Sequence, residues 1–273
     1  MTVRAFLAEL YRRDPLLALT GWAQVAVLAV VLVIAPFDDR TVLGLNPWIK
    51  PSKFLVSVAI YVWTVAWFLD YLRDARWARR TISGGVAGVM VLEIACIVIQ
   101  STRGVRSHFN DATAFDQIVF SLMGLGIAVN TVLLAMLGLL LLVRHTVLPR
   151  PYLWAVRLGV LLILLGSADG FVMIANGAHA VGVPDGGAGL PYVNWSTEAG
   201  DLRVAHGLGL HGFQILPLFA FGMSRARTGL TERGQVGLVF GFAAAYVATG
   251  AVLFLQAMTA RPLLSFLASG IVR

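Results

Sequence analysis

Imidazole and carboxylate side chains are concentrated in one polar stretch of a chain that is otherwise largely apolar. Residues 176–217 contain three of the five histidines of the protein. Histidine and carboxylate side chains bind zinc and iron, and they also act as general acids and bases. The members of this set are His179, Asp185, Glu198, Asp201, His206 and His211. The stretch therefore predicts a site for metal-assisted or acid–base chemistry.

The spacing of His206 and His211 limits how the two side chains can bind a metal. Five residues of a regular α-helix turn a side chain by about 140°, whereas two histidines that share an ion on a helix are typically four residues apart. We therefore expect that only one of them is a ligand, or that they have different partners. The candidate metal or haem ligands are His206, His211, His179 and His108, and the candidate catalytic groups are Glu198, Asp201, Glu93 and Asp169.

Glycines flank both of these histidines in the sequence HGLGLHG, at positions 207, 209 and 212. The missing side chains allow either a flat macrocycle or a neighbouring helix to approach the backbone closely. In the first interpretation, haem b has two imidazole ligands, His206 or His211 from this helix and His179 or His108 from elsewhere. In the second interpretation, the glycines serve tight helix packing.

The composition indicates that these residues belong to a membrane protein. Only 13% of the 273 residues are charged and 58% are hydrophobic, whereas soluble domains carry about 25% charged residues. The net charge of +7 is explained by basic loops that fix membrane topology, so we expect no nucleic-acid partner. One cysteine, Cys96, excludes an internal disulfide and a cysteine-based metal cluster.

The hydropathy pattern predicts an all-α bundle of seven transmembrane helices that forms one domain over residues 1–273. An interfacial amphipathic helix at 1–14 precedes the first span, and a long loop at 176–202 is a candidate lid over the bundle. The tail at 259–273 is too short to cross again. The predicted spans are about 17–36, 52–72, 81–101, 116–143, 152–175, 202–223 and 235–258.

Most of the 21 Lys and Arg residues lie on the side of the N-terminus. The positive-inside rule then predicts a cytoplasmic N-terminus and a C-terminus outside. Basic residues on the outer side are unexpected, and they predict contact with an anion, either a lipid headgroup or an anionic substrate. The outer basic group comprises Lys50, Lys53, Arg103 and Arg106.

Polar residues inside the predicted spans lie near the same outer level. An ionisable group in the bilayer is costly unless it is paired or faces a wet cavity, so each of these groups is a functional candidate. We expect one polar pocket that opens to the outer, periplasmic face, with Glu93 and Asp169 in its wall. The other lining residues are Asn176, Gln214 and Ser121.

These patterns favour a metal-dependent membrane enzyme that acts on a lipid-like or amphiphilic substrate, with zinc or iron as its metal. In this hypothesis Glu198 or Asp201 completes the metal shell or acts as the general base, and Glu93 and Asp169 orient the ligands. Two alternatives are a haem b or quinone-binding electron-transfer protein and a small-solute transporter or sensor. The absence of a convincing signal peptide and the short loops are typical of a multi-pass protein of a bacterial inner membrane.

Overall fold

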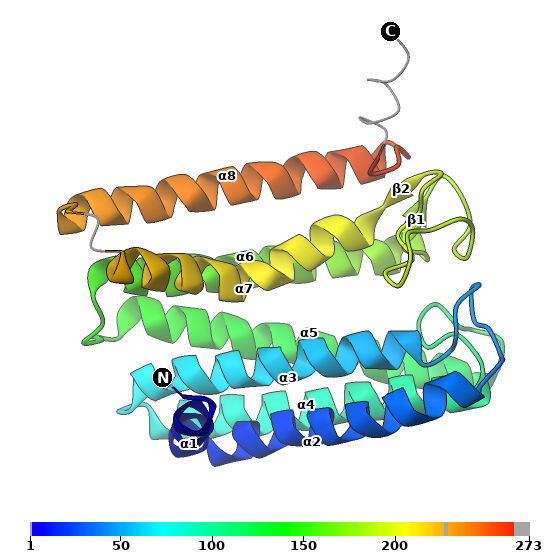
Figure 1. Ribbon diagram of the computed structural model, residues 1–273, viewed down its shortest axis with the longest axis horizontal. Helices are drawn as coiled ribbons and strands as arrows, with labels where there is room; N and C mark the ends of the chain where they lie inside the picture. The colour runs from blue at the N-terminus through cyan, green and yellow to red at the C-terminus, as the bar shows by residue number, and fades with distance from the viewer. Residues whose placement is uncertain (1, 227–228, 265–273) are drawn as a thin grey trace, which may run out of the picture. The chain divides into compact units, whose positions relative to one another are not determined.

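The computed structural model describes residues 2–226 and 229–264, and its long elements are all α-helices (Figure 1). Seven helical segments of the described residues are long and apolar enough to cross a membrane, close to the predicted spans. The protein is therefore a multi-pass membrane protein. The prediction for the tail at 259–273 falls mostly outside the described residues. The helices are α1 (Val3–Arg13), α2 (Pro15–Ile34), α3 (Ile49–Leu69), α4 (Arg76–Arg103), α5 (Ala114–Val143), α6 (Arg150–Asn176), α7 (Leu202–Arg225) and α8 (Glu232–Met258).

The chain divides into two compact units, Met1–Val147 and Leu148–Arg273. The N-terminal unit contains α1 to α5, with short 3-10 turns at Ala35–Phe37 and Asp70–Leu72. The C-terminal unit contains α6 to α8 and a small antiparallel pair of strands, β1 (Ala180–Val181) and β2 (Gly200–Asp201). The single pocket predicted from the sequence would need groups from both units, so it stays a prediction.

Helix α1 runs across the ends of α2 and α3, whereas α2 to α5 run alongside one another (Figure 1). Arg13 anchors it, because its guanidinium lies 3.9 Å from the centre of the Trp67 ring and donates a hydrogen bond to the Trp67 carbonyl at 2.9 Å. Arg12, Arg13 and Arg73 surround the buried carboxylate of Asp70. The structure has a helix at Val3–Arg13, within the range 1–14 predicted from the sequence, and its position on a membrane surface stays a prediction.

Asp14 and Pro15 define the start of α2. Asp14 accepts a hydrogen bond from the Leu17 N–H at 3.0 Å, and Pro15 takes the first helical position, where no amide hydrogen is needed. The Ser83 hydroxyl of α4 donates to the same carboxylate at 2.9 Å. Asp14 therefore caps α2 and also links this helix to α4 through a hydrogen bond.

Helices α6 and α7 pack closely through glycines. A Cβ atom added at Gly166 of α6 would lie 2.6 Å from the Leu210 nitrogen, and one added at Gly209 of α7 would lie 2.6 Å from the Gly166 Cα. A Cβ at Gly212 would lie 2.5 Å from Leu162. At these positions of the HGLGLHG segment the missing side chains make room for α6, as expected for helix packing, and the same space is not left for a macrocycle.

Replacing Gly166 by alanine is expected to destabilise the C-terminal unit by about 1–3 kcal/mol, because the added methyl group meets backbone atoms that cannot move independently. The control is Gly88→Ala in α4, where an added Cβ meets no atom within 4 Å. Its expected effect is neutral or slightly stabilising, because alanine favours helix. Thermal unfolding of both purified variants measures the difference, and equal unfolding temperatures would contradict this account of the α6–α7 contact.

Candidate functional site

The loop between α4 and α5, residues 104–113, folds back into the N-terminal unit. Ser107 is 4% exposed and Asn110 is 6% exposed, which is unusual for polar residues of a connection. Asn110 donates a hydrogen bond to the Arg106 carbonyl at 2.9 Å and fixes the turn. Phe109 has a φ of 51°, a left-handed conformation that costs a non-glycine residue roughly 1–2 kcal/mol. Strain of this kind is often found at functional sites.

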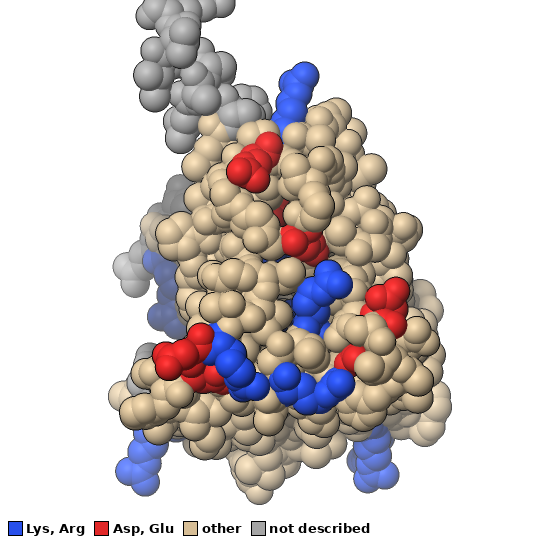
Figure 2. Space-filling model, turned by 90° about the vertical axis from the view of Figure 1, so that its right-hand side faces the viewer, with Lys and Arg blue, Asp and Glu red and all other residues tan. Residues whose placement is uncertain are grey.

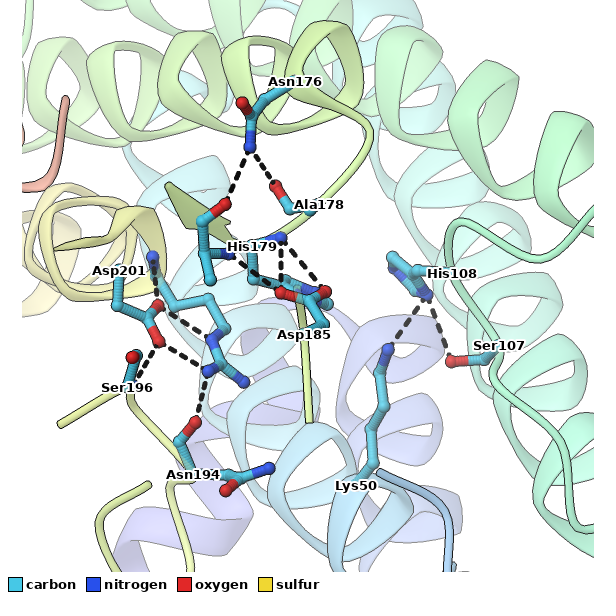
Figure 3. Close-up of polar contacts among 12 residues, drawn as sticks. Lys50, Ser107, His108, Asn176, Ala178, His179, Asp185, Asn194, Ser196 and Asp201 are labelled. Atoms are coloured by element: carbon cyan, nitrogen blue, oxygen red, sulfur yellow. Dashed lines mark hydrogen bonds and ion pairs between the residues drawn. The ribbon is translucent and has the colours of Figure 1, made fainter. Parts of the chain in front are cut away.

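This buried loop places His108 between a lysine and a glutamate. The Lys50 Nζ, in the first turn of α3, lies 3.2 Å from the His108 Nδ1. The Ser107 hydroxyl lies 3.1 Å from the same ring nitrogen, and Figure 3 shows both side chains directed at it. On the other side of the ring, Nε2 lies 3.8 Å from Oε1 of Glu93 on α4. Three elements therefore contribute one row of groups, Lys50–His108–Glu93.

The hydrogen-bonding chemistry of these groups assigns the histidine tautomer. A lysine ammonium can only donate, so the His108 Nδ1 accepts and, in the neutral ring, Nε2 carries the hydrogen toward Glu93. An imidazole that accepts a proton at one nitrogen and gives one up at the other is a proton shuttle. The row can therefore pass a proton between the loop side of the unit and Glu93.

Glu93 is 3% exposed, and its second oxygen, Oε2, has no hydrogen-bond partner among the described residues. The surroundings of the row are apolar. The rings of Phe54 and Phe120 have their centres 6.0 Å from that of His108, and Phe109 lies at 6.2 Å. A buried carboxylate with an unused acceptor in such surroundings calls for an explanation. A proton or a hydrogen-bond donor on a ligand would satisfy it.

The four cations predicted to bind an anion do not behave as one group. Arg103 forms an ion pair with the buried carboxylate of Asp116, which also accepts from Gln100 at 2.8 Å and from the Thr113 hydroxyl at 2.6 Å. Arg103 therefore stabilises the start of α5 through its ion pair with Asp116. Arg106 is exposed and Lys53 is partly buried, while Lys50 contacts His108. Figure 2 shows a face that is mostly uncharged and has no broad basic patch.

In the C-terminal unit, His179 and Asp185 form a close pair at the start of the loop after α6. The Asp185 carboxylate lies 2.7 Å from the His179 Nδ1 and accepts hydrogen bonds from the His179 and Ala180 amides at 3.1 and 2.9 Å (Figure 3). Burial opposes ionisation, but the hydrogen bond from His179 and the backbone amides hold the pKa of Asp185 well below its usual range. Asn176 donates to the Ala180 carbonyl at 3.0 Å. These contacts stabilise the fold of the loop that follows α6.

Asp201 has a structural environment rather than that of a catalytic base. It caps α7 by accepting from the Arg203 N–H at 3.1 Å, and its oxygens also accept from the Arg203 guanidinium at 2.9 and 2.6 Å and from the Ser196 N–H at 2.8 Å (Figure 3). Glu198, the alternative base, is exposed. Among the described residues, neither acid lies in a group of side chains that could hold a metal ion.

The two histidines of α7 have different environments, as their spacing predicted. His206 Nδ1 lies 2.8 Å from the Gly166 carbonyl, which can only accept, and the ring lies against Gly170. His211 is exposed. Asp169 of α6 is 8% exposed, and neither of its oxygens has a hydrogen-bond partner among the described residues. Of the predicted lining residues, Gln214 is partly buried, while Asn176 and Ser121 are exposed.

Within residues 2–226 and 229–264, no three side chains of His, Cys, Asp and Glu form a group that could hold a metal ion. The described residues therefore give no support to the predicted zinc, iron or haem site. Comparison with protein-family models, with curated proteins and with solved structures finds no match to this chain. The argument for function depends on the side chains alone.

Proposed function

We propose that this membrane protein is a proton-coupled transporter of a small solute and that Glu93 carries the proton. The row Lys50–His108–Glu93 is the observation on which the proposal depends. Its three groups come from α3, the loop at 104–113 and α4, so a rearrangement of any of these elements would change the contact that Glu93 makes. A link of this kind between a carboxyl group and the elements that hold it is what coupling requires.

A carboxyl group inside a span is suited to this role because its two protonation states differ strongly in energy. An ionised carboxylate in apolar surroundings is unfavourable unless a cation or several donors face it. Lys50 can supply that charge through His108, and a proton on Glu93 can replace it. The charge of the Glu93 carboxylate can therefore be compensated in two ways, by the ammonium of Lys50 or by a bound proton.

The other functions considered from the sequence have less support among the described residues, where no three side chains of His, Cys, Asp and Glu form a group that could hold a metal ion. A metal-dependent enzyme for lipid-like substrates needs a ligand set, and a haem b or quinone protein needs a cofactor site between helices. The relay needs only groups that already lie close together, with the Lys50 Nζ 3.2 Å from the His108 Nδ1 and the His108 Nε2 3.8 Å from Oε1 of Glu93. With a cytoplasmic N-terminus, the loop at 104–113 faces outward, so the relay opens to the periplasmic side of a bacterial inner membrane.

Transport measurements on proteoliposomes test the proposal. Vesicles that contain an entrapped pH dye receive small organic acids, amines or uncharged solutes in turn. At least one class is expected to cause proton movement in the wild type, and Glu93→Gln should abolish it. Glu198→Gln makes the same chemical change at an exposed residue and should leave the movement unchanged. The proposal fails if no class moves protons, or if Glu93→Gln behaves like the wild type.

A further inference from the structure

We infer that Asp169 of α6 is a second proton-binding site, and that the C-terminal unit therefore carries a proton of its own. This inference goes beyond the proposed function, because no residue of the row Lys50–His108–Glu93 takes part in it. It depends on two observations, the position of Asp169 on the packed face of α6 and the lack of a hydrogen-bond donor for its carboxylate among the described residues.

Asp169 lies about two turns before the end of α6, on the face of this helix that packs against α7 and α8. Leu162 belongs to the core that α6 forms with those two helices, and Leu158 packs against the same core. Asp169 follows these leucines by seven and eleven residues, and both spacings return a side chain to the same side of an α-helix. The carboxylate therefore points into the C-terminal unit.

The carboxylate of Asp169 is shielded both from solvent and from donors. The residue is 8% exposed, and neither of its oxygens has a hydrogen-bond partner in the described part of the chain. An ionised carboxylate in such a place is strongly unfavourable unless a cation or several donors face it. A bound proton removes the charge, and the hydroxyl that results is itself a donor. The neutral acid is therefore the form that this position favours.

The other buried aspartates show what the chain provides where a carboxylate stays ionised. Asp14 accepts hydrogen bonds from an amide and from a hydroxyl group, and Asp70 is surrounded by three arginines. Asp116 and Asp201 each pair with an arginine and accept further hydrogen bonds. Among the buried aspartates of the described residues, Asp169 is the exception.

Helices α6 and α8 provide no counter-ion for Asp169. The nearest charged residue on α6 is Arg157, twelve positions earlier, or about 18 Å along the helix axis. On α8, Tyr246 is the only titratable residue between Arg233 and Arg261. Its hydroxyl donates a hydrogen bond to a main-chain carbonyl of α7 at 2.7 Å.

The charged and titratable groups at the start of α7 and in the loop before it have other partners or are exposed. Arg203 and His179 each form a pair with an aspartate of the same region. His206 Nδ1 lies 2.8 Å from a main-chain carbonyl of α6, and Glu198 and His211 are exposed. The described residues therefore leave the charge of an ionised Asp169 uncompensated, and a proton compensates it.

Infrared spectroscopy of the full-length protein in nanodiscs at pH 7 tests the inference. The carbonyl stretching band of a protonated carboxyl group is separate from the bands of ionised carboxylates. An exposed aspartic acid, whose usual pKa is about 3.9, is ionised at this pH and does not contribute to the band. Protein with ¹³C in the side-chain carboxyl of every aspartate should show the band of Asp169 at a lower frequency, whereas a band of Glu93 would not move.

The variant Asp169→Asn should lose the whole of the labelled band and still fold, because its amide is a neutral group of nearly the same shape. Glu198→Gln makes the matching change at an exposed acid and should leave this part of the spectrum unchanged. If Asp169→Asn does not fold, the labelled wild type still decides the question, because the other buried aspartates have donors or cations as partners.

Two outcomes would overturn the inference. The first is that the labelled wild type has no band of a protonated aspartate at pH 7. The second is that Asp169→Asn keeps the labelled band at full intensity, which would assign the proton to another aspartate. Neither outcome affects the proposed function, which depends on Glu93 and on the transport measurement. Likewise, a labelled band in a protein that moves no protons would support the site at Asp169 and remove the proposed function alone.

Discussion

Replacement of His108 by phenylalanine is expected to slow solute-driven proton movement by about 100-fold or more, the usual contribution of a positioned acid–base group. The ring contacts Phe54, Phe109 and Phe120, so a phenyl group should pack in the same place. It has no nitrogen to join Lys50 to Glu93. Proton movement in proteoliposomes measures the effect, and thermal unfolding shows whether the variant is folded.

A second substitution separates proton transfer from simple hydrogen bonding. The His108→Gln amide can hydrogen-bond to both neighbours but does not titrate, so it should be nearly as slow as the phenylalanine variant. His145→Phe is the matched control, because this histidine is exposed in the loop after α5, and it should behave like the wild type. Wild-type proton movement in His108→Phe would remove His108 from the mechanism and leave Glu93 without a relay.

The helices could be predicted from the sequence because the bilayer imposes their length. A span needs about 20 apolar residues, and runs of that length leave little choice of boundaries. The prediction of 116–143 became Ala114–Val143, and 235–258 became Glu232–Met258. Local residues such as Asp14 and Pro15 define the ends of the helices in the structure. Each of these features depends on neighbours in sequence, so no knowledge of the tertiary structure was needed.

The candidate site could be predicted only in part, because its contacts join residues that are far apart in the chain. Glu93 stood out as an acid in a span, and His108 as a loop histidine. The contact between Lys50 and His108 crosses 58 positions, and no pattern in the sequence encodes it. Ser107 gave no signal at all, since a serine in a polar loop is ordinary. The burial of that loop by aromatic rings made it part of the site.

The glycines beside His206 are a second feature whose role could not be predicted from the sequence alone. The segment HGLGLHG favoured haem contact and helix packing equally, because both need small residues. The close approach of Gly209 to Gly166 supports helix packing. The spacing of His206 and His211 was more informative, because five residues of a regular α-helix turn a side chain by about 140° and so place the two rings on different faces. His206 is bonded to the Gly166 carbonyl, and His211 is exposed.

Replacement of Asp201 by alanine is expected to destabilise the C-terminal unit by about 3–5 kcal/mol, the range for removing one member of a buried ion pair. Asp201 is 4% exposed and accepts hydrogen bonds from Arg203 and from the Ser196 amide. Its loss leaves the guanidinium without its carboxylate and an amide without an acceptor, and it also removes the cap of α7. Thermal unfolding and proteolysis of the loop at 182–199 measure the effect.

The control for this prediction is Glu198→Ala, an exposed acid three residues away, which should change stability by no more than about 0.5 kcal/mol. Asp201→Asn keeps the shape of the side chain, and the folded fraction of this variant should move protons at the wild-type rate. A loss as large as that of Glu93→Gln would return Asp201 to the active groups that the sequence suggested. Because its oxygens already accept four hydrogen bonds from Arg203 and Ser196, we expect the loss to appear in stability alone.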